Sequence, residues 1–225
     1  MLEGFHNPPT LVSYAFSCEV ALSNAMLAGY DKEYKDLDAF TRGEIDLRLL
    51  GLPSVDLMLL HWPCATMNET ITTYRALERF ALAGKARAIG ISNFNASLID
   101  ALYAAPGGLR VKPAVNQCGF SVGGHSTPTF GRDFDTFNKC KEKGITFSAY
   151  SPLGGLSGVD VLNDPRVKAI GAAHNKSSAQ VALRWLTQQQ VLPVTASTKR
   201  SHLASDLDSL DFMLTDDEIA KLTKI

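Results

Sequence analysis

Short apolar runs alternate along this chain with longer stretches in which apolar residues recur every three or four positions. Buried strands of a parallel sheet are short, nearly continuous apolar runs bounded by residues that break the strand. The clearest run begins at Val55 and ends at His61, and Pro63 stops it. Runs of this kind predict strands at Val12–Val20, Val55–Trp62, Ala86–Ser92, Ala114–Ser121, Ile145–Ser151 and Val191–Ser197.

Helices are predicted between these strands. Gly84 follows one amphipathic stretch and is a good C-terminal stop, while Thr215 and Glu218 have the spacing of a capping box. The predicted helices cover Asp31–Leu50, Ile71–Ala83, Ala96–Ala105, Asp133–Glu142, Ser178–Thr187 and Thr215–Lys224. Alternation of strand and helix with short connections favours a parallel sheet built from right-handed β-α-β units.

Two architectures have this alternation, an open doubly wound sheet and a closed barrel. The first predicted strand has no glycine-rich phosphate loop after it, and no G-x-G-x-x-G occurs in the chain. We therefore expect an α/β fold of the TIM (β/α)8 type, as one barrel domain over residues 1–225. A complete barrel has eight strands. The pattern is therefore two strands short of a complete barrel.

Composition narrows the class of protein. The chain has 225 residues, 45% of them hydrophobic and 20% charged, which is ordinary for a globular protein, and its formal net charge is -1. A charge so near zero does not favour nucleic acid or an anionic membrane as partner. The N-terminal residues lack the pattern of a signal peptide, so we expect a cytoplasmic protein. The four scattered cysteines suggest neither a zinc site nor a redox motif, and we expect them to be reduced.

Polar side chains follow the later predicted strands where each strand ends. They are the pairs Ser92-Asn93, Asn116-Gln117, Tyr150-Ser151 and Ser197-Thr198. Catalytic groups of α/β barrels lie at these C-terminal strand ends, and His61 is placed there too. Amide and hydroxyl groups that converge on one face can orient a flat polar ring, on which Tyr150 can stack. Residues 151–158 are rich in glycine and serine, so their backbone can approach a pyrophosphate.

At this point the sequence resembles the aldo-keto reductase family, whose members are TIM barrels that bind NADPH without a Rossmann fold. The resemblance covers roughly residues 29 to 225 and follows the order of the family's motifs. The matching segments are Leu52–Pro63, Gly84–Phe94, Pro113–Gln117, Ala149–Gly154 and Ser178–Trp185. The resemblance implies reduction of an aldehyde or ketone carbonyl by hydride from NADPH, with a small carbonyl compound as substrate.

The resemblance also implies a role for each matching residue. His61 matches the histidine that orients the substrate carbonyl beside the catalytic acid. Contacts to the cofactor are implied for Ser92, Asn93 and Gln117 at the nicotinamide carboxamide, Tyr150 beneath its ring, Ser151 and Leu153 at the pyrophosphate, and Ser197, Lys199 and His202 at the adenosine 2′-phosphate. No metal is implied.

The catalytic acid is the point at which this chain departs from the family. Family members protonate the carbonyl oxygen with a tyrosine that a lysine, paired with an aspartate, keeps acidic. Aligned with the family, the lysine position holds Glu19 and the aspartate and tyrosine have no counterpart. The resemblance therefore implies that the first two β/α units are missing or remodelled. Tyr14 and Tyr30 are better explained as packing residues.

The phosphate segment departs as well, because His202 stands where an arginine is usual, and histidine is mostly neutral at pH 7. Two readings therefore stay open. The first is an NADPH-dependent carbonyl reductase. The second is a catalytically impaired protein that binds nucleotide or a partner, or a truncated reductase fragment without the catalytic Tyr, Asp and Lys. Exposed strand edges of an incomplete barrel would favour self-association.

Overall fold

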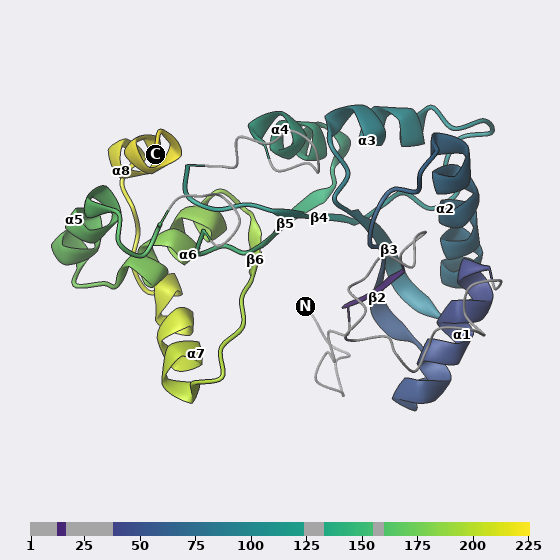
Figure 1. Cartoon of the computed structure of the whole chain (residues 1–225), viewed down its shortest axis with the longest axis horizontal. Coiled ribbons are helices and arrows are strands. Elements are labelled where there is room, and N and C mark those ends of the chain that lie inside the picture. Colours follow the sequence, from purple (N-terminus) through teal and green to yellow (C-terminus); the bar gives the residue numbers. More distant parts are fainter. Residues whose placement is uncertain (1–12, 17–37, 124–132, 155–159) are drawn as a thin grey trace, which may run out of the picture. The chain divides into compact units, whose positions relative to one another are not determined.

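The computed structural model describes residues 13–16, 38–123, 133–154 and 160–225 (Figure 1). The chain divides into two compact units, one made of residues 1–92 and 100–115 and the other of residues 93–99 and 116–225. We refer to them as the first and the second unit and describe each by itself. The prediction of a single barrel domain stays a prediction.

Among its described residues, the first unit contains three strands and the helices that connect them. Its elements are β1 (Ser13–Phe16), α1 (Ala39–Leu50), β2 (Val55–Leu60), α2 (Met67–Leu82) and β3 (Ala86–Ser92). The strands are hydrogen-bonded in the order β1-β2-β3, and both ladders are parallel. Helix α3 (Ala96–Tyr103) follows β3.

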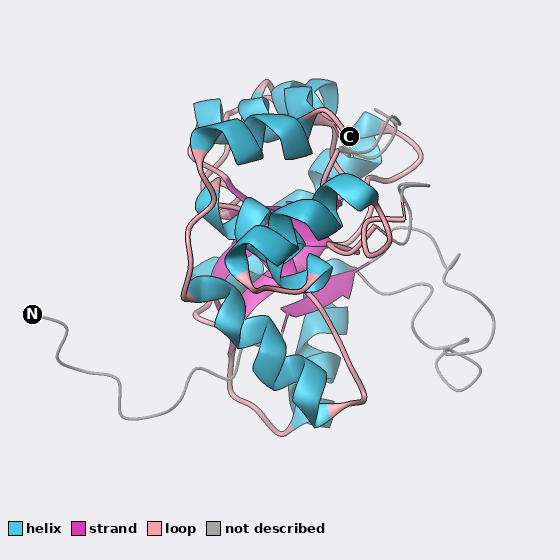
Figure 2. Ribbon diagram, turned by 90° about the vertical axis from the view of Figure 1, so that its left-hand side faces the viewer, coloured by secondary structure: helices cyan, strands magenta, loops and turns pink. Residues whose placement is uncertain are grey.

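The second unit has the same alternation. Its elements are β4 (Val115–Gly119), α4 (Phe134–Lys143), β5 (Thr146–Tyr150), α5 (Pro165–His174), α6 (Ser178–Gln188), β6 (Leu192–Val194), α7 (Arg200–Leu207), a short 3-10 helix (Asp208–Leu210) and α8 (Asp216–Thr223). The strand order is β4-β5-β6, and β5 pairs with β6 in parallel. Each predicted strand has a counterpart among the described residues, so the α/β prediction is confirmed (Figure 2).

A buried carboxylate organises the loop after α3 in the first unit. The side chain of Glu78, on α2, is only 1% exposed and forms an ion pair with Arg75 at 2.7 Å. Its other oxygen accepts hydrogen bonds from the backbone N–H groups of Arg110 and Val111, at 2.6 and 3.0 Å. The hydroxyl of Tyr74 donates to the Val111 carbonyl at 3.0 Å. The loop that leads into β4 is therefore fixed by α2.

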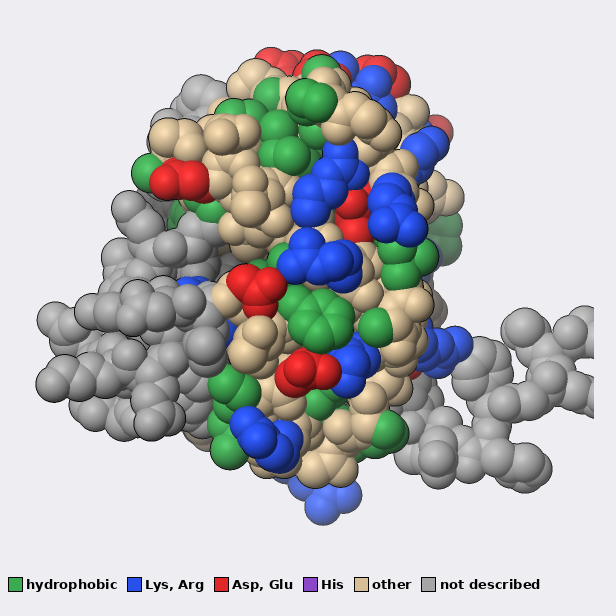
Figure 3. Space-filling view, turned by 90° about the vertical axis from the view of Figure 1, so that its right-hand side faces the viewer, with side chains coloured by type: hydrophobic (Ala, Val, Ile, Leu, Met, Phe, Trp, Pro, Cys, Tyr) green, Lys and Arg blue, Asp and Glu red, His purple; other side chains and the backbone are tan. Residues whose placement is uncertain are grey.

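One face of the first unit carries both signs of charge side by side (Figure 3). Arg79 pairs with Asp38 across α2 and α1, and Arg87 pairs with Asp56 across two strands. Such exposed pairs contribute little to stability. Their alternation leaves no large field of one sign among these residues, in keeping with the near-neutral net charge.

Aromatic rings form the core of the second unit. Phe120 contacts Trp185 in a stacked arrangement at 5.7 Å and Phe147 edge-on at 5.3 Å, measured between ring centroids. Trp185 on α6 is fully buried. Edge-to-face and offset contacts of this kind stabilise beyond the area that they bury. Phe137 on α4 also meets Phe147 edge to face, so the core joins the helices α4 and α6 to the strand β5.

The predicted capping box at the start of α8 is confirmed. The Thr215 hydroxyl accepts from the Glu218 N–H at 3.2 Å, and the Glu218 carboxylate accepts from the Thr215 N–H at 2.8 Å. The same carboxylate contacts His174 Nε2, at the end of α5, at 2.9 Å. These contacts tie α8 to α5.

The cysteines only partly follow the prediction of reduced thiols. Cys118 and Cys140 are free and buried, and burial raises the pKa of the Cys140 thiol to about 11. Cys64 is disulfide-bonded, so the prediction is wrong for that residue. In the described part of the chain, no helix is both long and apolar enough to cross a membrane.

Candidate functional site

The turn after β3 holds Asn93 in an unusual conformation. Asn93 is 1% exposed and has a φ angle of 63°, in the left-handed region. Its N–H donates to the Gln117 carbonyl on β4 at 3.0 Å. Asparagine tolerates this region better than most residues, yet a buried example still carries a backbone cost that persists only where surrounding contacts enforce it. Backbone strain of this kind is concentrated at functional sites.

Tyr150, at the end of β5, contacts this turn directly. Its hydroxyl donates to Oδ1 of Asn93 at 2.8 Å. Its carbonyl accepts from the Phe120 N–H, just after β4, at 3.1 Å. Because the backbone and the hydroxyl are both held, the half-buried ring of Tyr150 has a fixed orientation.

A second strained turn begins immediately after Tyr150. Ser151 has a φ angle of 52°, and its carbonyl accepts from the Gly154 N–H at 3.1 Å. Leu153 lies inside this turn and is half-buried. Serine has no special tolerance for the left-handed region, so the turn is enforced by its surroundings. The rest of the predicted pyrophosphate loop, residues 155–159, lies outside the described residues.

Asn116 is a positioning residue that sequence reasoning noticed only as part of a polar pair. It is fully buried on β4, and its Nδ2 donates to the Phe94 carbonyl at 2.9 Å. This bond holds the turn that carries Asn93. The sequence does indicate this role, because an asparagine in the middle of a buried strand needs hydrogen-bond partners for its amide.

The segment after β6 leads into α7, whose N-terminus has no side-chain cap and is open to a ligand in this sense. Lys199 is the N-cap of α7 and makes no side-chain capping bond, while its own N–H donates to the Ser197 hydroxyl at 3.1 Å. Lys199, Arg200 and His202 are all exposed. The first N–H groups of a helix and its dipole favour an anion, and two flanking cations add to this preference. This end of α7 can therefore hold a phosphate group.

His61 and Ser92 belong to the first unit. His61 follows the last residue of β2, is half-buried, and its ring lies 5.8 Å from that of Trp62. Burial lowers the pKa of His61, so the imidazole is neutral at pH 7. Ser92 is the buried last residue of β3. Both residues lie at C-terminal strand ends, as the sequence predicts.

The structure brings together three of the predicted cofactor residues, since Asn93 contacts both Gln117 and Tyr150. It also places Ser197 beside Lys199. Glu19, Tyr30 and the side chain of Tyr14 lie outside what the structure describes. The backbone of Tyr14 is part of β1, paired with Met58.

Comparison with known proteins now decides the family. The family model described as "Aldo/keto reductase family" matches residues 26–225. The chain belongs to the aldo/keto reductase family. This family has a (β/α)8 barrel, which accounts for the parallel strands and for the placing of polar residues at their C-terminal ends. The chain is accordingly related to oxidoreductases.

Curated relatives agree with this assignment. The chain is 36% identical over 207 residues to morphine 6-dehydrogenase of Pseudomonas putida, which covers 88% of this chain and 64% of that protein. It is 33% identical over 198 residues to 9,11-endoperoxide prostaglandin H2 reductase of Trypanosoma cruzi, covering 88% and 63%. The chain thus spans slightly less than two thirds of the length of these relatives.

Solved structures of the family are similar to the described fold. An aldo-keto reductase of Bombyx mori in complex with NADP has a TM-score of 0.69 and 28% identity, over 83% of this chain and 62% of that one. An aldo/keto reductase of Brucella melitensis has a TM-score of 0.69 and 29% identity, over 83% and 66%. One of these aldo/keto reductases therefore holds NADP.

Proposed function

We propose that this member of the aldo/keto reductase family binds NADPH and reduces an aldehyde or ketone. The observation that carries the proposal is the contact of Tyr150 with the strained Asn93 turn, together with the open start of α7. A planar ring, an oriented amide and a phosphate-binding helix start are the groups that a nicotinamide dinucleotide requires. The complex of the Bombyx mori relative with NADP supports this choice of cofactor.

The residues present fit such a cofactor. The side-chain amides of Asn93, after β3, and Gln117, on β4, offer donors and acceptors for a carboxamide, and the ring of Tyr150 offers a face for stacking. The turn that begins at Ser151 brings backbone close to its ligand, which suits a pyrophosphate. Ser197, Lys199 and Arg200 suit the 2′-phosphate that distinguishes NADPH from NADH.

When bound, NADPH supplies a hydride to the carbonyl carbon, and the carbonyl oxygen takes a proton, which gives an alcohol. His61 suits the substrate end of such a reaction. Its burial lowers the pKa of the imidazole, so the ring can donate one hydrogen bond to a carbonyl oxygen without carrying a charge. We assign His61 the role of orienting the substrate. We assign no residue the role of proton donor.

The assay that tests this proposal follows NADPH absorbance with 4-nitrobenzaldehyde and other aldehydes as substrates. We expect oxidation of NADPH that depends on the aldehyde and is reduced in His61→Gln. NADPH binding is measured separately, by quenching of the fluorescence of Trp62 and Trp185 and by the melting temperature. Binding without oxidation would favour the second candidate, a nucleotide-binding protein without turnover, and neither binding nor oxidation would contradict both.

Preference for NADPH over NADH is tested by the same titration. Lys199→Gln and Arg200→Gln each remove one cation at the start of α7. We expect each change to weaken NADPH binding by about tenfold and to leave NADH binding nearly unchanged, because only NADPH carries the 2′-phosphate. Equal losses for both nucleotides would contradict the assignment of this segment.

A further inference from the structure

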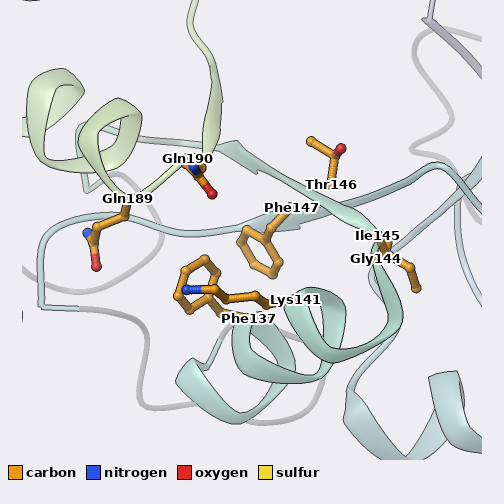
Figure 4. Close-up of a pocket in the computed structure, with 8 residues that line it drawn as sticks. All are labelled: Phe137, Lys141, Gly144, Ile145, Thr146, Phe147, Gln189 and Gln190. Atoms are coloured by element: carbon orange, nitrogen blue, oxygen red, sulfur yellow. The ribbon is translucent and has the colours of Figure 1, made fainter.

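A cavity of about 250 Å3 lies in the second unit at the N-terminal end of β5 (Figure 4). It is lined by Phe137, Lys141, Gly144, Ile145, Thr146, Phe147, Gln189 and Gln190. Drug-sized ligands occupy pockets of roughly 300 to 1,000 Å3, so this one suits a smaller molecule. Tyr150 lies at the other end of the same strand, about 13 Å away at the usual rise of a strand. The cavity is thus separate from the candidate cofactor site.

Two aromatic rings form the apolar wall of this cavity. Phe137 on α4 and Phe147 on β5 meet edge to face, with ring centroids 5.7 Å apart and planes at 89°. Phe147 is buried, whereas Phe137 is half-buried. A third ring placed against such a pair gains the favourable geometry of aromatic contacts. The wall therefore selects a flat aromatic group.

In the part of the chain that the structure describes, one cation beside this wall has no carboxylate partner. In Figure 4, the side chain of Lys141 extends from α4 beside the ring of Phe137. Its neighbours Lys139 and Lys143 are both paired with Glu142, each at 2.9 Å. Within the described residues, Lys141 has no such ion pair. Its charge is consequently available to an anionic ligand.

The opposite side of the cavity supplies a neutral polar group. Gln190 lies in the turn between α6 and β6, with a φ angle of 64°, and its side chain is exposed. The neighbouring Gln189 is held by a bond from its Nε2 to the Trp185 carbonyl at 2.9 Å. The NH2 group of a carboxamide donates hydrogen bonds. Gln190 can therefore bind one oxygen of a ligand carboxylate while Lys141 binds the other.

We propose that this cavity binds a small aromatic carboxylate of the benzoate class, with its ring against Phe137 and Phe147 and its carboxylate on Lys141. The ligand carries one negative charge, because one lysine, Lys141, is among the described residues that line the cavity. This proposal is independent of the proposed reductase activity. It names a binding site away from the C-terminal strand ends.

Benzoate titrated into the full chain, followed by backbone amide shifts in NMR spectra, tests the proposal. We expect saturable shifts at Lys141, Gly144 and Gln190, and weaker binding of benzyl alcohol, which has the ring but no charge. Binding should persist in the presence of excess NADPH, because the cavity lies away from the cofactor site. Absence of saturable binding, or shifts confined to the turn of Asn93 and to Tyr150, would overturn the proposal.

Matched variants locate the site. Lys141→Gln should weaken benzoate binding by roughly tenfold or more, since a hydrogen bond to a charged group is lost, whereas Lys139→Gln should stay within about twofold of the parent. Gln190→Asp should weaken benzoate binding as well, by charge repulsion, while Gln190→Asn, which keeps the amide and tolerates the left-handed turn, should retain it. Equal losses in Lys141→Gln and Lys139→Gln would overturn the proposal.

Discussion

The hydroxyl of Tyr150 donates a hydrogen bond of 2.8 Å to the side-chain oxygen of Asn93. This bond joins the end of β5 to the turn after β3, across β4. It orients the Asn93 amide so that the oxygen faces Tyr150 and the nitrogen points away from it. It also fixes the plane of the tyrosine ring. One contact thus sets two of the groups proposed to hold the nicotinamide.

Tyr150→Phe keeps the ring and removes the bond to Asn93. We expect NADPH binding to weaken by about tenfold, because the amide loses its fixed orientation while stacking is retained. Titration of tryptophan fluorescence with NADPH measures the effect, and Tyr103→Phe, in the first unit's part of α3, serves as the control. If Tyr150→Phe binds NADPH as the parent does, the ring alone accounts for the role of Tyr150.

Substitution of Asn93 separates the backbone cost from the loss of the amide. Asn93→Gly and Asn93→Ala both remove the side-chain acceptor, but only glycine takes a φ angle of 63° without strain. We expect the free energy of unfolding of the alanine variant to lie about 1 kcal/mol below that of the glycine variant. Urea unfolding measures the difference. Equal stabilities would mean that the turn relaxes when Asn93 is replaced.

The apolar runs of the sequence predicted the strands well because buried parallel strands have a distinctive pattern. The run from Val55 predicted β2 to within two residues, and Thr215 with Glu218 predicted the start of α8. The contact between Tyr150 and Asn93 was beyond such reasoning, because 57 positions separate the two residues and no local pattern encodes their register. The family resemblance placed both residues at the cofactor but did not join them.

The left-handed conformation of Ser151 was also beyond local reasoning. Serine has no preference for a positive φ angle, so the turn is imposed by the strand before it and the bond from Gly154 to Ser151. The same holds for the role of Asn116, which depends on a bond to Phe94, 22 positions away. A polar residue in a buried strand indicates that a hydrogen bond exists, but the sequence pattern does not identify the partner.

The pKa of His61 predicts a dependence of stability on pH. Burial lowers this pKa from its ordinary value of 6.5, so the unfolded chain takes up the proton more readily than the folded one. The stability that His61 contributes is present above pH 6.5 and is lost as the pH falls through the lowered pKa of the folded state. Urea unfolding across this range measures the loss. His61→Gln should flatten it, whereas His202→Gln, at an exposed position on α7, should not.

Glu78 is expected to matter for stability because its carboxylate is 1% exposed and binds Arg75 and two backbone N–H groups. Glu78→Gln removes the charge that Arg75 and two backbone N–H groups share. We expect the free energy of unfolding to fall by about 2 kcal/mol, as is usual when buried hydrogen bonds to a charged group are lost. Urea unfolding measures this change. Glu142→Gln, at an exposed ion pair, should cause no measurable loss, and a similar loss in both variants would contradict the argument.

The edge of the strand β6 predicts self-association. In the described part of the chain β6 has β5 as its one strand neighbour, and Leu192 and Val194 are 55% and 45% exposed. Exposed apolar edge strands pair with other chains, and a lysine on such an edge opposes pairing. We expect the sedimentation coefficient to rise with concentration, and Leu192→Lys to reduce the rise. Leu82→Lys is the matched control, because Leu82 is 54% exposed but lies on the helix α2. A sedimentation coefficient that is independent of concentration, or an equal effect of both lysines, would contradict pairing through β6.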